Sequence, residues 1–432
     1  FYYSKLKALE GEGTAVIDMA AVSRFLLERK AFIEISGNNL NHPNDFFYRF
    51  YTDVFAELFT RLKEERENRA DLSAYLEKPK FESTELKGLP ENVKSGFLVN
   101  KVNGKIRKTF CFIASPVPSV GKSPAVVLVH GAGGNAYAEW ASAFAEKGYT
   151  AISIDTNATF FEGSVSSARK DNPYAVAQDT GGFGGIDGKS ENDWIYGSAA
   201  QIISAASYLK ALDSVDETRV GVVGISWGGV LSLVALGANA GFAAGAIIYS
   251  GGFITEDVLG EQTGIFSDYI KKRAYDTRFD PSAYAENIDV PVLMTAGLTD
   301  GAFSPDNRKR TCDLFKVKPE QAFLPYILHD NESNFRNANV FAFMDRILKN
   351  EGTAPELRVK ISGGKLYIKT DKCVSRAEMY YCESESLRGA EWKTEALNLS
   401  ENGKKIPKKA RCVCVTAFFG EGLFKSSDIV RV

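Results

Sequence analysis

The sequence predicts an α/β protein with a mostly parallel sheet and helices on both of its faces. Apolar runs such as residues 125–129 recur between about residue 120 and residue 330, and a parallel strand that is buried on both faces reads in this way. Stretches with helical spacing separate these runs, and strand–helix alternation is typical of parallel sheets. One strand runs through Gly224-Ile225-Ser226-Trp227-Gly228 directly into a helix-like stretch.

The bulk composition is that of an ordinary globular protein. The chain has 432 residues, of which 44% are hydrophobic and 25% charged, so two or three domains are expected. A net charge of −2 argues against nucleic acid or an acidic membrane as the main partner. No apolar run is long enough to span a bilayer. We expect a soluble protein, either cytoplasmic or exported after loss of a signal, and the composition indicates no oligomeric state.

Residues 1–88 are expected to form an N-terminal helical segment that packs on the core. Aromatic and aliphatic residues recur there with helical spacing; they are Phe47, Phe50, Val54, Phe55, Leu58, Phe59 and Leu62. The preceding loop, residues 41–45, ends in a helix-capping sequence, and its His42 is interpreted as a surface residue.

Residues 89–352 are expected to form the α/β domain. A hairpin over 95–114 precedes the first buried strand, 125–129, which ends in His130-Gly131-Ala132-Gly133-Gly134. In chain order, the further strands are expected at 149–154, 219–225, 244–249, 291–296 and 322–328, and the helices at 136–147, 192–212, 230–240, 305–315 and 335–348. The irregular stretches 156–190 and 250–285 are expected to be loops that wall the site.

Residues 353–432 are expected to form a C-terminal all-β sandwich, because apolar residues alternate there with period two between glycine-rich turns. This region holds Cys373, Cys382, Cys412 and Cys414. Their spacing does not suit a zinc site, so no metal is expected. They are interpreted as buried thiols, with a disulfide between neighbouring strands as the alternative.

The turn at Ser226 has the pattern of a nucleophile elbow. The tight turn places Ser226 in a strained backbone region, and glycines flank it because side chains there would collide with the neighbouring strand and helix. A serine hydroxyl needs a base to act as a nucleophile. His329 is the histidine that follows the last parallel strand, and Asp300 follows the strand before it. The order Ser226, Asp300, His329 suggests nucleophile, orienting acid and base.

The remaining histidine and aspartates near the predicted site are assigned to other tasks. His130 is expected to shape the glycine loop through hydrogen bonds within the turn, Asp155 to be structural, and Asp330 to point away from His329. An anionic intermediate needs N–H donors. We expect these from Trp227, directly after the nucleophile, and from Ala132 or Gly133 in the loop, where small residues let the backbone approach the substrate. No cofactor is expected.

These residues resemble the α/β-hydrolase superfamily, specifically its acetyl xylan esterase and dienelactone hydrolase-like branch. The similarity lies in the stretches 130–149, 219–229 and 297–305 and covers roughly residues 95–350. It implies an α/β-hydrolase fold and hydrolysis of carboxylic esters with a small acyl group, often acetyl on a sugar, with Ser226 and Asp300 in their family roles. The C-terminal β region resembles one that some bacterial members carry.

Two alternatives to an esterase remain open. Prolyl-oligopeptidase-type serine peptidases share these motifs, although they usually carry a β-propeller before the hydrolase domain. The second alternative is a catalytically weakened binding protein, because the related pattern is His-x-His-Glu and this chain reads His329-Asp330-Asn331-Glu332. If the second histidine of that pattern is the base, Asn331 stands in its place.

Overall fold

The computed structural model describes residues 71–432 apart from 103, 119–120, 177–192, 239, 258–274, 276–277, 372, 402 and 421, together with residues 23–24, 26–28, 30, 44 and 46–53. The chain divides into two compact units, Phe1–Asn68 and Arg69–Val432. In the first unit, residues 46–53 are helical and Asn44 Oδ1 accepts the N–H of Phe47 at 3.0 Å, as the capping sequence predicts. His42 and the rest of the predicted stripe, from Val54 onward, lie outside the described residues.

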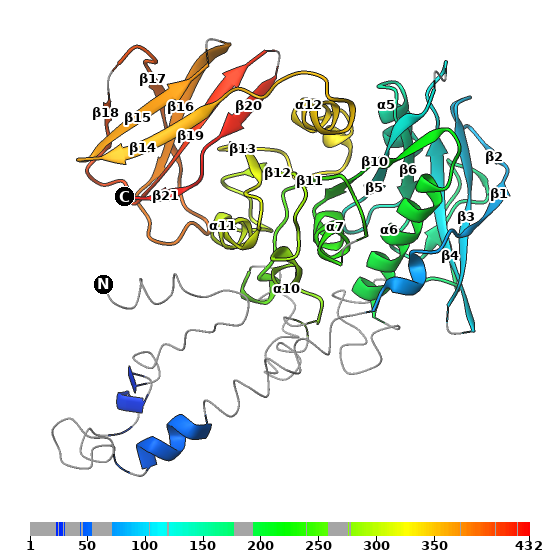
Figure 1. Cartoon of the computed structure of the whole chain (residues 1–432), viewed down its shortest axis with the longest axis horizontal. Coiled ribbons are helices and arrows are strands. Elements are labelled where there is room, and N and C mark those ends of the chain that lie inside the picture. Colours follow the sequence, from blue (N-terminus) through cyan, green and yellow to red (C-terminus); the bar gives the residue numbers. More distant parts are fainter. Residues whose placement is uncertain are drawn as a thin grey trace. The chain divides into compact units, whose positions relative to one another are not determined.

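The second unit is built on one long mixed sheet (Figure 1). Its strands in spatial order are β1 (Lys80–Thr84), β3 (Val93–Val102), β4 (Lys105–Ala114), β6 (Thr150–Ile154), β5 (Ser123–Val129), β10 (Val215–Ile225), β11 (Ala244–Ile248), β12 (Val292–Gly297), β13 (Glu320–Leu324), β20 (Leu423–Ser426), β19 (Cys412–Phe419), β16 (Val374–Cys382) and β17 (Lys393–Leu397), with β21 (Val430–Arg431) also paired to β19. The six strands from β6 to β13 are parallel. Every residue of β5, β6 and β11 is buried, as a doubly covered parallel sheet requires.

Helices cover both faces of the parallel strands (Figure 1). α5 (Ala138–Ala145) and α12 (Ala338–Met344) lie on one face, with a π-helical turn (Asp345–Lys349) after α12. α6 (Trp194–Lys210), α7 (Trp227–Gly237), α10 (Ser282–Ala285) and α11 (Pro305–Leu314) lie on the other. Alternate residues of β5 supply the two cores: Val127 packs with α6 and α7, and Leu128 packs with α5 and α12. The predicted fold class is confirmed.

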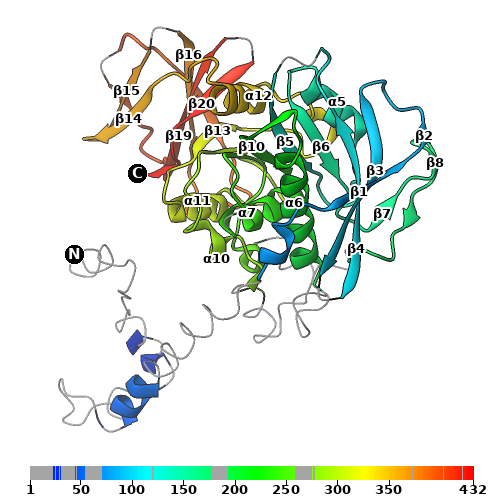
Figure 2. The same cartoon turned by 45° about the vertical axis from the view of Figure 1, so that its right-hand side comes forward.

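The prediction of a helix over residues 80–87 is wrong, because these residues form the short strands β1 and β2 (Leu86–Lys87) at the edge of the sheet. β1 pairs with β3 in antiparallel register, and β2 pairs with β8 (Gly163–Ser164). Beside them, β7 (Thr159–Phe160) pairs with β9 (Lys170–Asp171) in a stretch expected to be irregular (Figure 2). A single short 3₁₀ turn, η1 (Ser73–Tyr75), precedes β1. β1 has one aromatic residue, Phe81, packed 5.6 Å from Tyr208, so pairing with β3, rather than its own sequence pattern, makes it a strand.

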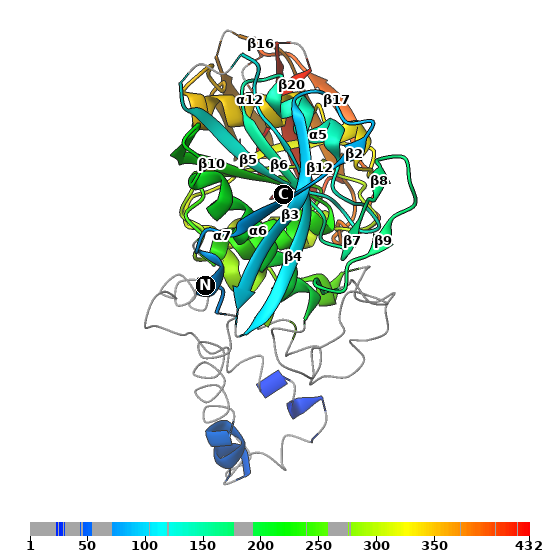
Figure 3. The same cartoon turned by 90° about the vertical axis from the view of Figure 1, so that its right-hand side faces the viewer.

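The C-terminal strands form the predicted sandwich, but they also prolong the main sheet. β14 (Leu357–Ser362), β15 (Lys365–Thr370) and β18 (Lys404–Lys405) form a separate small sheet. Leu366 of this sheet packs with Met379 of β16 and Val415 of β19. Figure 3 views the unit from the side of β3 and β4, which lie in front.

A polar seam joins the two parts of the long sheet. Gln321 of β13 pairs with Ser426 of β20. Thr416 Oγ1 donates to the carbonyl of Phe323 at 2.9 Å, and Ser426 Oγ accepts the Phe323 N–H at 2.7 Å. Because these contacts and a shared apolar cluster join residues 353–432 to the preceding strands, the C-terminal strands belong to the same compact unit as the α/β core.

All six cysteines are free thiols. Cys382, Cys412 and Cys414 are buried as expected, but Cys373 is exposed, so the expectation of a buried thiol is wrong at that position. Cys382 and Cys412 face each other across β16 and β19 without forming the disulfide considered above. In the described part of the chain, no group of three or more His, Cys, Asp or Glu side chains lies together as a metal site would require. No helix in that part has the length and apolar character needed to cross a bilayer.

Candidate active site

Ser226 lies in the strained turn between β10 and α7. Its backbone has φ 55° and ψ −120°, a region that residues with a side chain rarely adopt. Three hydrogen bonds hold this conformation. The Ser226 N–H donates to Ile248 O at 2.9 Å, and its carbonyl accepts from the N–H groups of Gly229 at 2.8 Å and Val230 at 3.2 Å. The side chain therefore stands at the carboxyl end of β10, over the N-terminus of α7.

Two glycines make room for this turn. A Cβ on Gly224 would lie 2.3 Å from the carbonyl oxygen of Gly228, and a Cβ on Gly228 would lie 2.1 Å from the carbonyl oxygen of Val129. Both distances are far inside van der Waals contact, and both obstacles are backbone atoms. The steric reason predicted for the flanking glycines is thus confirmed.

His329 bridges Ser226 and Asp300. Its Nδ1 lies 3.0 Å from Asp300 Oδ2, and its Nε2 lies 2.9 Å from Ser226 Oγ. Because an ionised carboxylate can only accept, we assign the imidazole proton to Nδ1. The unprotonated Nε2 then faces the serine hydroxyl, which is the arrangement needed to take up its proton. The structure brings these three residues together, although 103 residues separate His329 from Ser226.

Two aromatic rings that the sequence analysis did not single out hold the imidazole in place. The ring of Tyr249 lies 4.1 Å from that of His329, and the ring of Phe303 is parallel to it at 6.3 Å. Tyr249 is fully buried, and its hydroxyl donates to the carbonyl of Asp330, next to His329. The one sequence signal for Tyr249 is that it directly follows a buried strand, at the edge where the site forms.

Asp300 is held as a carboxylate. Its side chain is 2% exposed, and Oδ1 accepts the N–H groups of Ala302 at 2.8 Å and Phe303 at 3.0 Å. Burial alone would raise the pKa of Asp300, but the hydrogen bond and charge of His329, the Phe303 N–H and the nearby Arg308 outweigh it, so the pKa lies below its ordinary value.

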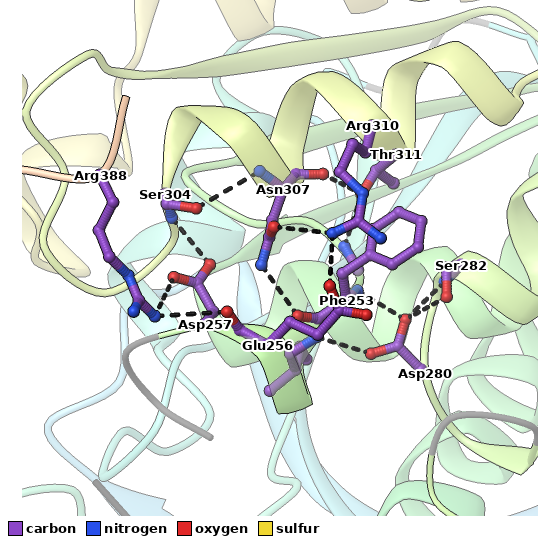
Figure 4. Close-up of polar contacts among 12 residues, drawn as sticks. Phe253, Glu256, Asp257, Asp280, Ser282, Ser304, Asn307, Arg310, Thr311 and Arg388 are labelled. Atoms are coloured by element: carbon purple, nitrogen blue, oxygen red, sulfur yellow. Dashed lines mark hydrogen bonds and ion pairs between the residues drawn. The ribbon is translucent and has the colours of Figure 1, made fainter. Parts of the chain in front are cut away.

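A polar network holds Ser304, which follows Asp300 in the chain, at the start of α11 (Figure 4). Ser304 caps α11, its Oγ accepting the N–H of Asn307 at 3.3 Å. The N–H of Ser304 donates to Asp257 Oδ2 at 2.8 Å. Asp257 is buried, and its Oδ1 lies 3.4 Å from Arg388 Nη2. Arg388 lies in the connection between β16 and β17, so Asp257 and a residue of the C-terminal region both support the segment that follows Asp300. The sequence gives no signal for this pairing.

The glycine loop is shaped by His130, as expected. His130 Nδ1 lies 2.7 Å from the carbonyl of Gly131, and Nε2 accepts the N–H of Thr156 at 3.0 Å. Both ring nitrogens are thus engaged within the loop region, and burial lowers the pKa of His130. Asp155 accepts the N–H groups of Asn157 and Thr159, consistent with the structural task expected of it.

The glycine loop lies beside Ser226, because a Cβ added to Gly131 would be 3.1 Å from Ser226 Cβ. The N–H groups of Ala132 and Gly133 donate to no other residue in the described part of the chain. Asn331 does not lie at the base position but reaches the loop, where its Oδ1 accepts the N–H of Gly131 at 2.9 Å. Asp330 caps the N–H of Ser333 at 2.7 Å and does not orient His329, as predicted.

Comparison with known proteins gives two family matches. Residues 53–250 match the acetyl xylan esterase (AXE1) family, and residues 188–340 match the prolyl oligopeptidase family. No curated protein is a significant sequence match to this chain. These matches confirm the resemblance to acetyl xylan esterases, and the dienelactone hydrolase part of it stays a prediction.

Solved acetyl xylan esterases share the fold. Acetyl xylan esterase 1 from Thermoanaerobacterium sp. JW/SL YS485 is 20% identical, with a TM-score of 0.50 over 66% of this chain and 98% of the other. The acetyl xylan esterase from Paenibacillus sp. R4 is 18% identical, with a TM-score of 0.52 over 66% of this chain and 99% of the other.

The close packing of Gly228 against β5 predicts that a larger residue at this position destabilises the fold. Gly228→Ala places a methyl group against the backbone of β5, and we expect it to lower the free energy of unfolding by about 3 kcal/mol or more. The matched control is Gly301→Ala, where no atom lies within 4 Å of the added Cβ. Thermal and urea unfolding of both variants test this. Equal stability of the two variants would contradict the steric account.

The lowered pKa of Asp300 predicts how the free energy of unfolding depends on pH. Since its pKa is lowered from 3.8 in the folded protein, its charge stabilises the fold above that value, and this contribution is lost as the pH falls through the lowered pKa. The stability difference between wild type and Asp300→Asn should therefore be largest near neutral pH and shrink below about pH 4. Urea unfolding across pH measures it. A difference that grows on acidification would refute the assignment.

Proposed function

We propose that this chain, a serine carboxylic ester hydrolase of the α/β-hydrolase superfamily, removes small acyl groups, acetyl in particular, from carbohydrate esters through an acyl-enzyme on Ser226. The observation that carries the proposal is the imidazole of His329 between Ser226 Oγ and Asp300 Oδ2, at 2.9 and 3.0 Å. A serine hydroxyl, an unprotonated nitrogen facing it and a carboxylate behind the ring form the geometry of an activated nucleophile.

The reaction follows from these positions. His329 Nε2 takes the proton of Ser226 as Oγ attacks the acyl carbon, and Asp300 stabilises the imidazolium that forms. The protonated Nε2 then gives its proton to the alcohol oxygen, which leaves. A water molecule enters, loses a proton to Nε2 and attacks the acyl carbon. Nε2 then returns this proton to Ser226 Oγ as the bond to the acyl carbon breaks, which releases the carboxylic acid and restores Ser226 and His329. None of these proton transfers and acyl transfers requires a cofactor or a metal.

The developing oxyanion lies next to backbone donors. The N–H of Trp227, at the start of α7, and an N–H from Ala132 or Gly133 in the glycine loop are the proposed donors. The dipole of α7 adds to their effect because the anion forms at the helix N-terminus. Arg169 binds the outer side of the same loop through the carbonyls of Gly134 at 2.7 Å and Gly133 at 3.4 Å.

A pocket beside this loop suits a sugar as the alcohol part. It has a volume of about 460 Å³ and joins residues that follow the glycine loop to residues that follow His329. Tyr137 and Phe335, whose ring centres are 4.8 Å apart, offer apolar faces, and Glu139 and Glu332 offer carboxylates. Aromatic faces beside hydrogen-bonding groups suit a molecule with apolar faces and hydroxyl edges. The match of residues 53–250 to acetyl xylan esterases favours the same substrate class.

A prolyl-oligopeptidase-like peptidase is the second candidate, favoured by the family match over residues 188–340. This match covers Ser226, Asp300 and His329, which are the parts that the two families share in mechanism. The third candidate, a weakened binding protein, rested on Asn331, and the reach of His329 to Ser226 argues against it.

The esterase proposal predicts turnover of p-nitrophenyl acetate. Ser226→Ala should lower kcat by about 10⁴-fold or more, because the alanine side chain has no hydroxyl to attack the acyl carbon. Ser400→Ala, on an exposed turn in the C-terminal region, is the matched control and should leave kcat unchanged. Equal rates in wild type and Ser226→Ala would contradict the proposal.

Acetylated xylo-oligosaccharide and a dipeptidyl p-nitroanilide separate the two hydrolase candidates. We expect release of acetate from the oligosaccharide with a kcat/KM well above that for the amide, since an alcohol leaves more readily than an amine. A faster reaction with the dipeptidyl amide would favour the peptidase instead.

A further inference from the structure

The peptide bond between Gly131 and Ala132 is fixed from its carbonyl end. The carbonyl of Gly131 lies 2.7 Å from His130 Nδ1 and accepts the N–H of Gly134 at 3.1 Å. In a trans peptide the N–H points opposite to the C=O. The N–H of Ala132 therefore points away from His130 and the interior of the turn.

The N–H of Gly131 is fixed from the other side of the site. Asn331 Oδ1 accepts it at 2.9 Å, in a contact between residues 200 positions apart. Gly131 also lies against the nucleophile, because a Cβ added to it would be 3.1 Å from Ser226 Cβ and 3.3 Å from Asn331 Oδ1. Any movement of Gly131 would therefore change the distance between the glycine loop and Ser226.

We propose that Asn331 is a positioning residue that holds Gly131 in place and so selects the N–H of Ala132 as the loop's oxyanion donor. The inference rests on the proposed function. Asn331 then serves a purpose of its own in this chain, although it stands where related sequences carry the second histidine. With its own N–H engaged by Asn331, Gly131 does not donate to the oxyanion, and the next N–H along the loop is that of Ala132.

Asn331 is itself rigidly held. It precedes a 3₁₀ turn, η5 (Glu332–Asn334), and its carbonyl accepts the N–H of Asn334 at 3.1 Å. The carbonyl of Asp330 accepts from Tyr249 Oη and from Asn334 Nδ2, the latter at 3.1 Å. His329 and Asn331 therefore belong to one braced turn, which sets the base and the glycine loop relative to Ser226 together.

Two substitutions of Asn331 distinguish the effect of losing the hydrogen bond to Gly131 from the effect of changing the side chain. Asn331→Ala removes the acceptor and leaves the N–H of Gly131 without a protein partner. Asn331→Asp keeps an acceptor of the same shape, and it gives up no hydrogen bond, because Nδ2 donates to no residue within the described ranges. The matched control is Asn398→Ala, where an exposed Asn Oδ1 also accepts a backbone N–H, that of Ser400 at 3.1 Å.

The test combines kinetics with hydrogen–deuterium exchange of the full chain. Removal of one oxyanion donor costs about 10²- to 10³-fold in kcat, so misplacing one should cost roughly 10-fold or more. For Asn331→Ala we expect that loss in kcat on p-nitrophenyl acetate, KM within about threefold, an unchanged Tm, and faster exchange in peptides that contain residues 130–134. Asn331→Asp should keep the exchange protection of wild type, and Asn398→Ala should match wild type in every readout.

Each outcome decides the inference. Wild-type kcat in Asn331→Ala, or exchange at 130–134 that is unchanged in Asn331→Ala or equally fast in both variants, overturns it while the esterase proposal stands. A fall in Tm that accounts for the loss of activity overturns it as well. If wild type itself lacks turnover that depends on Ser226, the proposed function fails and the positioning role fails with it.

Discussion

At the junction of β10 and α7 the backbone of Ser226 takes φ 55°, and Gly224 and Gly228 let the strand and helix close around it. A side chain on either glycine would meet backbone oxygens, so the turn exists only with this sequence and this packing. The strain is balanced by a hydrogen bond from the Ser226 N–H to strand β11 and by two hydrogen bonds that the first turn of α7 donates to the Ser226 carbonyl. Every other part of the site is arranged around the hydroxyl that this turn exposes.

The order of the strands explains how distant residues reach that hydroxyl. β10 lies between β5 and β11, followed by β12 and β13. The glycine loop follows β5, Asp300 follows β12 and His329 follows β13, and the carboxyl ends of parallel strands meet at one edge. The glycine loop thus approaches Ser226 from one side, and Asp300 and His329 approach it from the other. The hydrogen bond from the Gly131 N–H to Asn331 Oδ1 joins these two sides across Ser226.

The parts of this arrangement that depend on local pattern could be predicted from the sequence. Fully apolar runs identified strands such as β5, and Gly-x-Ser-x-Gly between a strand and a helix identified the elbow. Chain order alone then pointed to Asp300 and His329. β1 could not be predicted, because its single aromatic residue gives no period. The sheet continues into the C-terminal strands through a single residue pair, Gln321–Ser426. No pattern in either segment of the sequence predicts this pair. Tyr249, Asp257 and Asn331 act through contacts with residues far away in the chain.

In the proposed reaction, the hydroxyl oxygen of Ser226 forms a covalent bond to the acyl group. Mass spectrometry of peptides from protein mixed with p-nitrophenyl acetate and quenched in acid within one turnover tests it most directly. We expect the mass of one acetyl group on the peptide that contains Ser226, and its loss on longer incubation before the quench. Acetate release without any acetylated Ser226 peptide, or a stable acetyl group on a different residue, would contradict the account.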